Sequence, residues 1–314
     1  MRTSSTALID GAKIVGVEAA DYKESPSRDA LPAAPSPTSP SPLDPQGVQC
    51  LRLSAVLITF NAATQLDACL ASLAFADEIL VVDSGSTDAT VEIALRHGAR
   101  VVQQAWLGFG PQKRFAVGQA ANDWVLCLDA DERITPILRG SIAETLVHQG
   151  STDHPAWRMA RANVFMGRVL RHGEGYPDWN LRLFDRRHAR WSEDPVHENV
   201  VPDPGVPVGT LAGDLLHESS ETLSIYLAKQ NRYTDLQAQR LFEQGRRAGA
   251  LRIALAPLVR FIKFYVFRLG FLDGLPGLVH ILIGCQNSML KYAKLRELRQ
   301  AMVRAPARDI REKR

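Results

Sequence analysis

The chain has 314 residues, of which 46% are hydrophobic and 23% charged, so most of it can bury an ordinary globular core. Its net charge of +3 does not by itself indicate a nucleic-acid partner, and none is expected. The cysteines, at positions 50, 69, 127 and 285, form no C-x-x-C pair, which argues against a zinc site and for reduced thiols in a cytosolic protein.

Residues 1–50 differ in composition from the rest of the chain. Seven of the 18 prolines lie between Pro26 and Pro45, mixed with serine and alanine. Such a segment buries too little apolar surface to offset its ordering entropy, so a disordered leader is predicted, with a docking tail as the alternative. The N-terminus lacks a signal-peptide core, and the most apolar stretch, 274–290, is interrupted by Pro276 and His280, so neither secretion nor a membrane span is expected.

From residue 51 onward, strand-like and helix-like segments alternate. Continuous apolar runs predict strands buried on both faces, at 53–60, 78–82, 99–103 and 124–128. Apolar side chains at helical spacing predict helices that begin near 64, 88 and 135. This alternation predicts an α/β fold with a doubly wound, mostly parallel sheet, whose ligands bind at the carboxyl ends of the strands.

Capping residues predict how two of these helices begin. Thr64 and Asp67 have the spacing of a capping box at the start of the first helix. Thr135 and Pro136 have the order expected of a cap followed by proline in the first turn. Both starts are therefore predicted to be stabilised by side chains of the helix itself.

The second half of the chain has a less regular pattern. Residues 155–200 combine tryptophans, arginines and turn residues, which predicts short strands and loops folded onto the first half, on the acceptor side of the sheet. Residues 219–247 predict a charged helix, and 251–296 an apolar, basic helical tail. The predicted organisation is a leader at 1–50, a catalytic α/β domain at 51–218 and a helical region at 219–314.

Polar residues occur at the predicted strand ends. Asn61 follows the first strand, Asp83 ends the second and Asp129 ends the fourth. The carboxyl ends of parallel strands meet at one rim, so these side chains are predicted to gather there and to hold a nucleotide. The Ser84–Asp88 loop allows a tight turn and places Asp88 at a helix start, the alternative being that Ser86 and Asp88 merely cap that helix.

The pair Asp129 and Asp131 is the sharpest chemical signal in the sequence. Two carboxylates separated by one residue after a strand can both face a divalent cation. Mg²⁺ and Mn²⁺ take oxygen ligands, typically one or two protein carboxylates together with substrate phosphates. A D-x-D pattern alone has little specificity, and the preceding strand and the shared rim with Asp83 supply the context.

The ordered motifs LITFN (57–61), VVDSGSTD (81–88), Lys113-Arg114 and WVLCLDADE (124–132) resemble family 2 glycosyltransferases of GT-A fold. The later segments GYPD (175–178), RLF (182–184), VHE (196–198) and GFLDG (270–274) are similar to the branch that builds the lipopolysaccharide core. The resemblance covers about residues 53–200 and rests on several motifs in order and spacing.

The resemblance implies roles for the donor side of the site. Thr59, Asn61 and Asp83 would face the uridine of a UDP-sugar, together with Ser84 and Asp88. Lys113 would lie near the nucleotide or its phosphates. Asp129 would lie near the ribose and the metal, and Asp131 would bind a Mg²⁺ or Mn²⁺ ion that bridges the diphosphate. His217 is a candidate third ligand or diphosphate contact, the alternative being a histidine that is packed in the core or lies on the surface.

The resemblance also implies an inverting transfer, in which a carboxylate takes the proton of the acceptor hydroxyl. The predicted base is Glu198, with Glu193, Asp194 and Asp178 as alternatives. His197 would orient the base or contact phosphate. Arg182, with Arg158, Arg161, Arg168 and Arg171, would face an acidic acceptor, the alternative being a solvated positive surface.

The segment 251–268 has the pattern of an interfacial helix. Helical spacing brings Arg252, Arg260, Lys263 and Arg268 into one sector, with leucine, isoleucine, valine and phenylalanine opposite. This predicts attachment to an anionic membrane surface, the alternative being a helix packed on the catalytic domain. The expected location is the cytoplasm, peripheral on the inner face of the cytoplasmic membrane.

The function predicted from these features is a metal-dependent hexosyltransferase that moves a sugar such as glucose from a UDP-sugar to a lipid-linked glycan such as the lipopolysaccharide inner core. One alternative is transfer to a polyprenyl phosphate. A metal-dependent phosphohydrolase would leave Asp83 and the Ser84–Asp88 loop unexplained. A non-catalytic nucleotide-binding protein is a further alternative, disfavoured by the intact acidic set.

Overall fold

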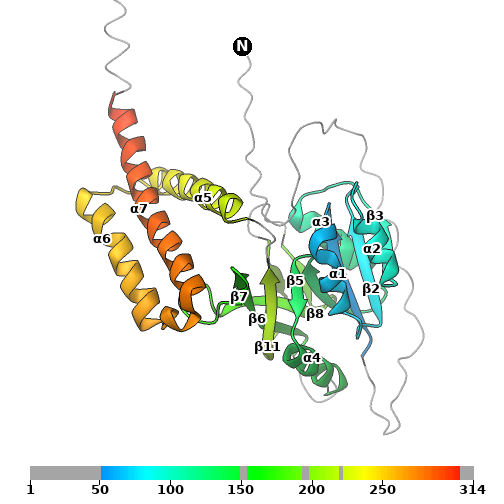
Figure 1. The fold of residues 1–314 in the computed structure, drawn as a ribbon. Coiled ribbons are helices and arrows are strands. Elements are labelled where there is room, and N and C mark those ends of the chain that lie inside the picture. Colours follow the sequence, from blue (N-terminus) through cyan, green and yellow to red (C-terminus); the bar gives the residue numbers. More distant parts are fainter. Residues whose placement is uncertain (1–50, 149–153, 193–197, 219–221, 305–314) are drawn as a thin grey trace, which may run out of the picture. The chain divides into compact units, whose positions relative to one another are not determined.

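The protein is described by a computed structural model that covers residues 51–148, 154–192, 198–218 and 222–304 (Figure 1). These described residues form two compact units, each considered by itself. The first unit comprises 51–161 with 178–217, and the second comprises 162–177 with the part of the chain from 218. The second unit therefore includes the segment 162–177, in addition to the helical region expected from the sequence.

The sheet of the first unit begins with parallel strands. β1 (Leu53–Thr59), β2 (Glu78–Asp83), β3 (Arg100–Gln103) and β4 (Trp124–Asp129) are neighbours in the order β3-β2-β1-β4. All four correspond to strands predicted from the apolar runs. The chain moves outward from β1 to β3 and then returns to add β4 on the other side of β1. This reversal opens a crevice at the carboxyl ends of β1 and β4, where ligands of such sheets bind.

Antiparallel strands extend the same sheet beyond β4. β8 (Asp178–Asp185) pairs with β4, and β6 (Ala156–Phe165) pairs with β8. β11 (Val208–Glu218) follows β6, and the short β5 (Glu132–Ile134) pairs with β11 at the edge. Residues 155–200, predicted to form short strands and loops, thus supply two long strands of the main sheet, β6 and β8. Both strands combine buried with half-buried positions, so neither has the continuous apolar run of β1 or β4.

Smaller strands complete the β-structure of the described residues. β7 (Arg168–Val169) forms a hairpin with the end of β6. β9 (Ala189–Trp191) and β10 (Val200–Pro202) pair with each other, with Val200 opposite Trp191. This ribbon brings Trp191 into the core of the first unit, where it is almost fully buried.

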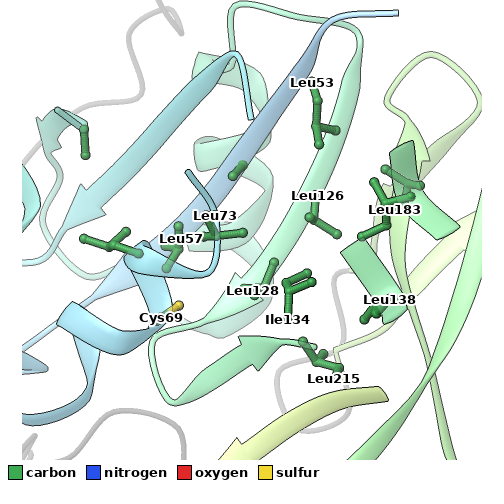
Figure 2. Packing of buried hydrophobic residues seen from close by; sticks show 14 of the residues in the cluster. Leu53, Leu57, Cys69, Leu73, Leu126, Leu128, Ile134, Leu138, Leu183 and Leu215 are labelled. Carbon is green, nitrogen blue, oxygen red and sulfur yellow. The ribbon is translucent and has the colours of Figure 1, made fainter. Parts of the chain in front are cut away.

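Helices cover both faces of the parallel strands. α1 (Ala63–Ala71), α2 (Thr90–Arg96) and α4 (Pro136–His148) contribute to one buried cluster, and α3 (Phe109–Gln119) contributes to the other. Alternate strand residues point to opposite faces, and Figure 2 shows the first cluster with labelled members from strands, helices and loops: Leu53, Leu57, Cys69, Leu73, Leu126, Leu128, Ile134, Leu138, Leu183 and Leu215. The strands whose ends form the rim are therefore packed between two buried apolar clusters.

The two predicted helix caps differ in outcome. At α4 the hydroxyl of Thr135 accepts a hydrogen bond from Leu138 N (3.3 Å), so the predicted cap is confirmed. At α1 the capping-box prediction is wrong, because Ala62 occupies the cap position and no side chain of that helix caps it. The amides of Ala62 and Ala63 instead donate to the Thr90 hydroxyl (2.8 Å) and to Asp88 Oδ2 (3.1 Å).

The second unit is mainly helical. α5 (Leu223–Glu243) and α6 (Ala250–Phe261) both contact α7 (Gly274–Arg304). Between α6 and α7 the chain forms a π-helical segment, η1 (Ile262–Phe267), and a 3₁₀ turn, η2 (Gly270–Asp273). The predicted helical segments are thus present, but the π-helical turns change the angular spacing after residue 261, on which the predicted basic sector depended.

Helix α6 exposes its apolar side chains. It has no buried residue, and the exposed large hydrophobic residues of the second unit include Leu251, Val259, Phe267 and Leu275, each more than 60% exposed. Among the described helices, none is by itself long and apolar enough to cross a membrane. The segments 250–267 and 270–302 meet that criterion only as a pair bent by 75°.

Candidate functional site

Asp83 holds the loop that follows β2. Its Oδ1 accepts hydrogen bonds from the hydroxyls of Thr59 (2.9 Å) and Ser86 (2.5 Å), and its Oδ2 accepts from the amides of Gly85 (3.0 Å) and Ser86 (2.8 Å). A carboxylate has about four acceptor sites, so the chain itself occupies them all. Contact between Asp83 and a nucleotide base stays a prediction, and it requires a base to share or replace one of these bonds.

Asn61 and Asp88 fasten the same loop to the end of β1. Asn61 has a φ of 49°, which asparagine tolerates better than most residues, and its Oδ1 accepts from Thr87 N (2.9 Å). Asp88 accepts from the amide (3.0 Å) and hydroxyl of Thr90. Burial opposes the charge of Asp88, yet the hydrogen bonds from Thr90 and Ala63 lower its pKa. The predicted rim residues therefore lie together as one braced surface.

Helix α3 contacts the polar residues at the carboxyl ends of the strands, although the sequence did not predict it as a helix. The side-chain amide of Gln112 donates to Ser84 Oγ (3.1 Å), and Gln112 is fully buried. The next residue of the helix, Lys113, is buried as well and is 4% exposed. This helix is the element that brings a cation to the end of β4.

Asp129 is held between two buried cations. Lys113 Nζ lies 2.8 Å from its Oδ1, and Arg182 Nη2, from β8, lies 2.9 Å from its Oδ2. All three side chains are no more than 5% exposed. In this structure a metal ion would have to compete with both cations for Asp129, so its role as a ligand stays a prediction.

Glu132 completes this network. Its Oε1 lies 2.8 Å from Arg182 Nη2, and its Oε2 accepts a hydrogen bond from Asp129 N (2.9 Å). Burial opposes the charge of Arg182, but Glu132 and Asp129 raise the pKa of the guanidinium above its usual value. Arg182 is thus buried against Asp129 and Glu132 and does not lie on an open acceptor face. Its predicted contact with acceptor stays untested.

Glu198 lies on the other side of Lys113. Its Oε1 is 3.6 Å from Lys113 Nζ, and its side chain is 7% exposed. The indole of Trp191 lies beneath the ammonium, 4.4 Å from Nζ to the ring centroid. The structure therefore brings together Lys113, Asp129 and Glu198, three residues predicted for the site from separate motifs.

A small cavity adjoins this cluster within the first unit. It is lined by Lys113, Cys127, Arg182 and Trp191 together with apolar residues of β1 and β4. Burial raises the pKa of the Cys127 thiol to about 11, so Cys127 is a neutral packing residue at neutral pH. The cations of the cluster are thus enclosed by uncharged walls, which strengthens their interaction with the carboxylates.

Asp131 has a different environment from Asp129. Its Oδ2 lies 3.1 Å from Nε2 of His217, and its Oδ1 is buried without a hydrogen-bond partner among the described residues. His217 reaches this position because β11 pairs with β5 in a register that sets it opposite Glu132. An unsatisfied buried carboxylate oxygen is costly unless a ligand or ion completes it.

The donor set at Asp131 fits a divalent cation that brings most of its own ligands. Within the described segments no group of three or more histidine, cysteine, aspartate or glutamate side chains could enclose a metal. Asp131 and His217 can supply one oxygen and one nitrogen, and substrate phosphates and water supply the rest in many Mg²⁺ and Mn²⁺ sites. The residues present therefore suit a metal bound together with a diphosphate.

Other predicted residues have different placements. His197, Glu193 and Asp194 lie outside the described residues. Asp178 is 39% exposed and pairs with Arg161 Nη2 at 2.7 Å, and Arg161 Nη1 lies 3.7 Å from Glu132 Oε1, so Asp178 is linked to the buried network through Arg161. The predicted arginine surface is divided, since Arg158, Arg161 and Arg182 belong to the first unit and Arg168 and Arg171 to the second.

Sequence reasoning missed Glu132, Gln112 and Trp191 as parts of the site. Glu132 directly follows Asp131, and this adjacency is the sequence signal that could have identified it, whereas its complete burial is seen only in the structure. Gln112 and Trp191 reach the site through α3 and the β9–β10 ribbon. Neither residue belongs to a motif in the sequence, so tertiary structure alone places them.

Comparison with known proteins identifies the family. Residues 54–197 match the model of glycosyl transferase family 2. A lipopolysaccharide core biosynthesis glycosyltransferase, LpsC of Rhizobium meliloti, is 32% identical over 252 residues, which cover 78% of this chain and 92% of LpsC. An uncharacterized glycosyltransferase of Rickettsia bellii is 33% identical over 257 residues, which cover 79% of this chain and 87% of that protein.

A solved structure shares part of the chain. Glucosyl-3-phosphoglycerate synthase from Mycobacterium tuberculosis, in complex with Mn²⁺, UDP-glucose and phosphoglyceric acid, is 24% identical and covers 35% of this chain and 43% of its own, with a TM-score of 0.31. A likeness of this extent supports no conclusion about function. The match to LpsC across nearly its whole length is what establishes that this chain is a glycosyltransferase of family 2, with the α/β fold of the GT-A type.

Proposed function

We propose that this glycosyltransferase transfers a hexose such as glucose from a UDP-sugar to a hydroxyl of a lipid-linked glycan, such as the lipopolysaccharide inner core. The observation that carries the donor side is the buried, unpartnered Oδ1 of Asp131 beside His217 at the switch point of the sheet. The similarity to LpsC, a lipopolysaccharide core biosynthesis glycosyltransferase, supports the acceptor class.

The nucleotide binds along the rim formed by the ends of β1 and β2. Asn61, Ser84 and Asp88 border the rim, and Thr59 and Asp83 support it through their mutual hydrogen bond. Asp83 contacts the base after one of its four internal bonds is exchanged. The adjacent end of β4 then places the diphosphate near Asp131, since β1 and β4 are neighbours in parallel register.

Asp131 and His217 would hold a Mg²⁺ or Mn²⁺ ion, which would supply positive charge that offsets the charge of the diphosphate. Asp129 stays paired with Lys113 and Arg182 and contacts the ribose edge. Lys113 adds positive charge close to the phosphates. The division of labour between the two aspartates follows from their partners: cations hold Asp129, whereas Asp131 keeps a buried oxygen available.

Glu198 is the base in the proposed transfer. The acceptor oxygen forms a bond to the anomeric carbon while the bond from that carbon to the diphosphate oxygen breaks. The electron pair leaves with UDP, and the hydroxyl proton passes to the Glu198 carboxylate, so configuration at the anomeric carbon inverts. Support for this role comes from the near-complete burial of Glu198 and its position beside Lys113.

The exposed apolar surface of α6, η1 and η2 attaches the enzyme to the inner face of the cytoplasmic membrane, where a lipid-linked acceptor is found. Leu251, Val259 and Phe267 are exposed apolar side chains, and Lys263 and Arg268 are exposed basic ones. Apolar insertion combined with basic residues is the composition of an interfacial segment on anionic lipid. Arg260, predicted to share this surface, is instead paired with Glu174.

A donor screen tests the proposal. Calorimetry with UDP-, GDP- and ADP-glucose, each with Mn²⁺, Mg²⁺ or EDTA, should show metal-dependent binding of the UDP-sugar and its loss in Asp131→Ala. Transfer should then require a lipid-linked core glycan and not a polyprenyl phosphate. Metal-independent binding, or binding unchanged in Asp131→Ala, would refute the proposed site, and transfer to polyprenyl phosphate would refute the proposed acceptor.

A further inference from the structure

The second unit contains a polar cavity of about 180 Å³. Its walls come from α5, α6 and α7 and from Glu174 in the segment before Pro177, all within the same unit. Figure 1 shows these helices as the yellow to red elements. The volume has room for several water molecules, so it can hold a small polar ligand. None of its lining residues belongs to the donor or transfer site described above.

Internal polar contacts fix the walls in place. Arg260 Nε donates to Glu174 Oε2 (3.0 Å), and Arg260 Nη1 donates to Ser288 Oγ (3.0 Å). On the opposite side Asn287 Nδ2 donates to Gln230 Oε1 (2.8 Å). These contacts link α6 and α5 to α7, so the cavity is largely preformed and does not need to be ordered by its ligand.

A glycine allows the arginine to approach α7. A Cβ at Gly284 would lie 2.5 Å from Glu174 Oε2 and 2.9 Å from Arg260 Nε, closer than side chains can approach. The absence of a side chain at this position therefore makes room for the Arg260–Glu174 pair. Because that pair is internally neutral, the wall it forms presents hydrogen-bonding groups without a strong net charge.

His280 lines the cavity with unused hydrogen-bonding capacity. Its ring contacts those of Phe165 and Tyr226, with centroids 5.4 Å and 6.4 Å away, but among the described residues neither ring nitrogen has a hydrogen-bond partner. Burial, assisted by Arg260, lowers the pKa of His280, so the imidazole is neutral at neutral pH. A neutral imidazole offers one donor and one acceptor.

Gln237 and Lys291 add to this open capacity. The Gln237 amide has no hydrogen-bond partner within the described residues, and Lys291 Nζ lies over the Tyr292 ring, 5.2 Å from its centroid. The cavity thus combines unused donors and acceptors with an adjacent aromatic residue, Tyr226. A phosphate offers mainly acceptor oxygens and carries negative charge that would face the oxygens of Glu174 and Gln237, whereas an uncharged hydroxyl both donates and accepts.

We propose that this cavity is a carbohydrate-binding site that takes one hydroxyl-rich sugar ring of a glycan. The ring hydroxyls bond to His280 and Gln237, and the ring packs beside Tyr226. Lys291 is placed to pair with an acidic substituent where the sugar carries one. The site belongs to the helical unit and would hold a sugar that does not react, which goes beyond the donor and acceptor chemistry proposed for the first unit.

NMR of the full-length protein, with its histidine side chains labelled isotopically, tests this site. The imidazole resonance of His280, assigned by its disappearance in His280→Phe, should shift saturably with glucose or glucuronic acid and not with inorganic phosphate. The phenylalanine keeps the ring contacts with Phe165 and Tyr226, so the unit is expected to fold. Gln237→Ala should weaken sugar binding about tenfold, the effect of losing one hydrogen bond.

Gln286→Ala is the matched control, because Gln286 is exposed on α7 and does not line the cavity. It should bind sugar like the parent protein. A His280 resonance that responds to phosphate alone, or to neither sugar, overturns the proposal, as does equal binding in Gln237→Ala and Gln286→Ala. UDP-sugar binding measured on the same samples separates this outcome from failure of the donor site.

Discussion

Asp131 Oδ2 and His217 Nε2 lie 3.1 Å apart, whereas Asp131 Oδ1 is buried and has no hydrogen-bond partner in the described part of the chain. Two residues earlier, Asp129 has both oxygens paired with cations. One short motif thus presents two carboxylates of opposite character. Cations of the protein neutralise the first, Asp129, and the second, Asp131, has one oxygen that pairs with no cation among the described residues.

Asp131→Asn should reduce kcat/KM for sugar transfer by about 100-fold or more, because a metal at the diphosphate contributes several kcal/mol of charge stabilisation in the transition state. The fold should survive, since Asp131 Oδ1 has no partner to lose. Initial rates with and without Mn²⁺ measure the effect. Asp67→Asn, at an exposed residue of α1, is the control and should leave the rate unchanged.

His217→Gln should weaken activation by Mn²⁺ by about 10- to 100-fold, the usual effect of losing a residue that binds or orients at a metal site. Saturating metal should restore most of kcat, because the proposed base and the Lys113 cluster are intact. Rates titrated against free Mn²⁺ give both quantities. If half-maximal activation stays at the parent's Mn²⁺ concentration, His217 has no part in metal binding.

Glu198→Gln should lower kcat by about 100- to 10,000-fold, the range expected when a general base is removed. Binding of the UDP-sugar, measured by calorimetry, should persist because the rim at β1 and β2 is unchanged. Asp178 was an alternative candidate for the base, so Asp178→Asn is the matched variant, and it should retain activity. A larger loss in Asp178→Asn than in Glu198→Gln would reassign the base.

Arg182→Met should destabilise the protein by about 3–5 kcal/mol, because it leaves Asp129 and Glu132 buried without their shared cation. Both carboxylates are almost fully buried. The free energy of unfolding from urea titration measures the loss. Arg190→Met breaks an exposed pair with Asp203, in which the side chains are 61% and 38% exposed, and should cost about 1 kcal/mol or less.

Replacing both Leu251 and Phe267 with serine should abolish binding to vesicles that contain anionic lipid, since these side chains are 72% and 78% exposed on the proposed membrane surface. Co-sedimentation with phosphatidylglycerol vesicles measures binding, and neutral vesicles should bind the parent protein weakly. Ile137→Ser, at an exposed residue of the first unit, is the control. Retention of the double variant on the vesicles would show that another surface attaches the protein.

The sequence predicted the parallel part of the sheet well, because strands such as β1 and β4 are buried on both faces and appear as continuous apolar runs. α3 was missed because its buried positions include Gly110, Gln112 and Lys113, so it lacks a simple apolar stripe. Because Gln112 and Lys113 occupy buried positions of α3, the apolar pattern that would have predicted this helix is interrupted.

The candidate site was predictable as a set of residues but not as a set of contacts. Local motifs identified Asp83, Asp129 and Asp131, since each ends or follows a strand. The pairing of Arg182 with Asp129 depends on β8 joining β4 in antiparallel register, a long-range event that leaves no local signal. The bonds from the amides of Gly85 and Ser86 to Asp83 are local, yet no sequence motif indicated that the loop uses the oxygens of Asp83 in this way, and contact between Asp83 and a nucleotide stays a prediction.

The pairing of β11 with β5 has a consequence for biosynthesis. His217 meets Asp131 only after β11 has docked against β5, with Leu216 opposite Arg133 and Leu215 opposite Ile134. A nascent polypeptide whose synthesis has passed the Asp129–Asp131 turn therefore carries half of this carboxylate–imidazole pair until the strand at 208–218 leaves the ribosome. The Asp131–His217 pair is therefore completed only after the strand at 208–218 has been made, and a chain released before that point would lack it.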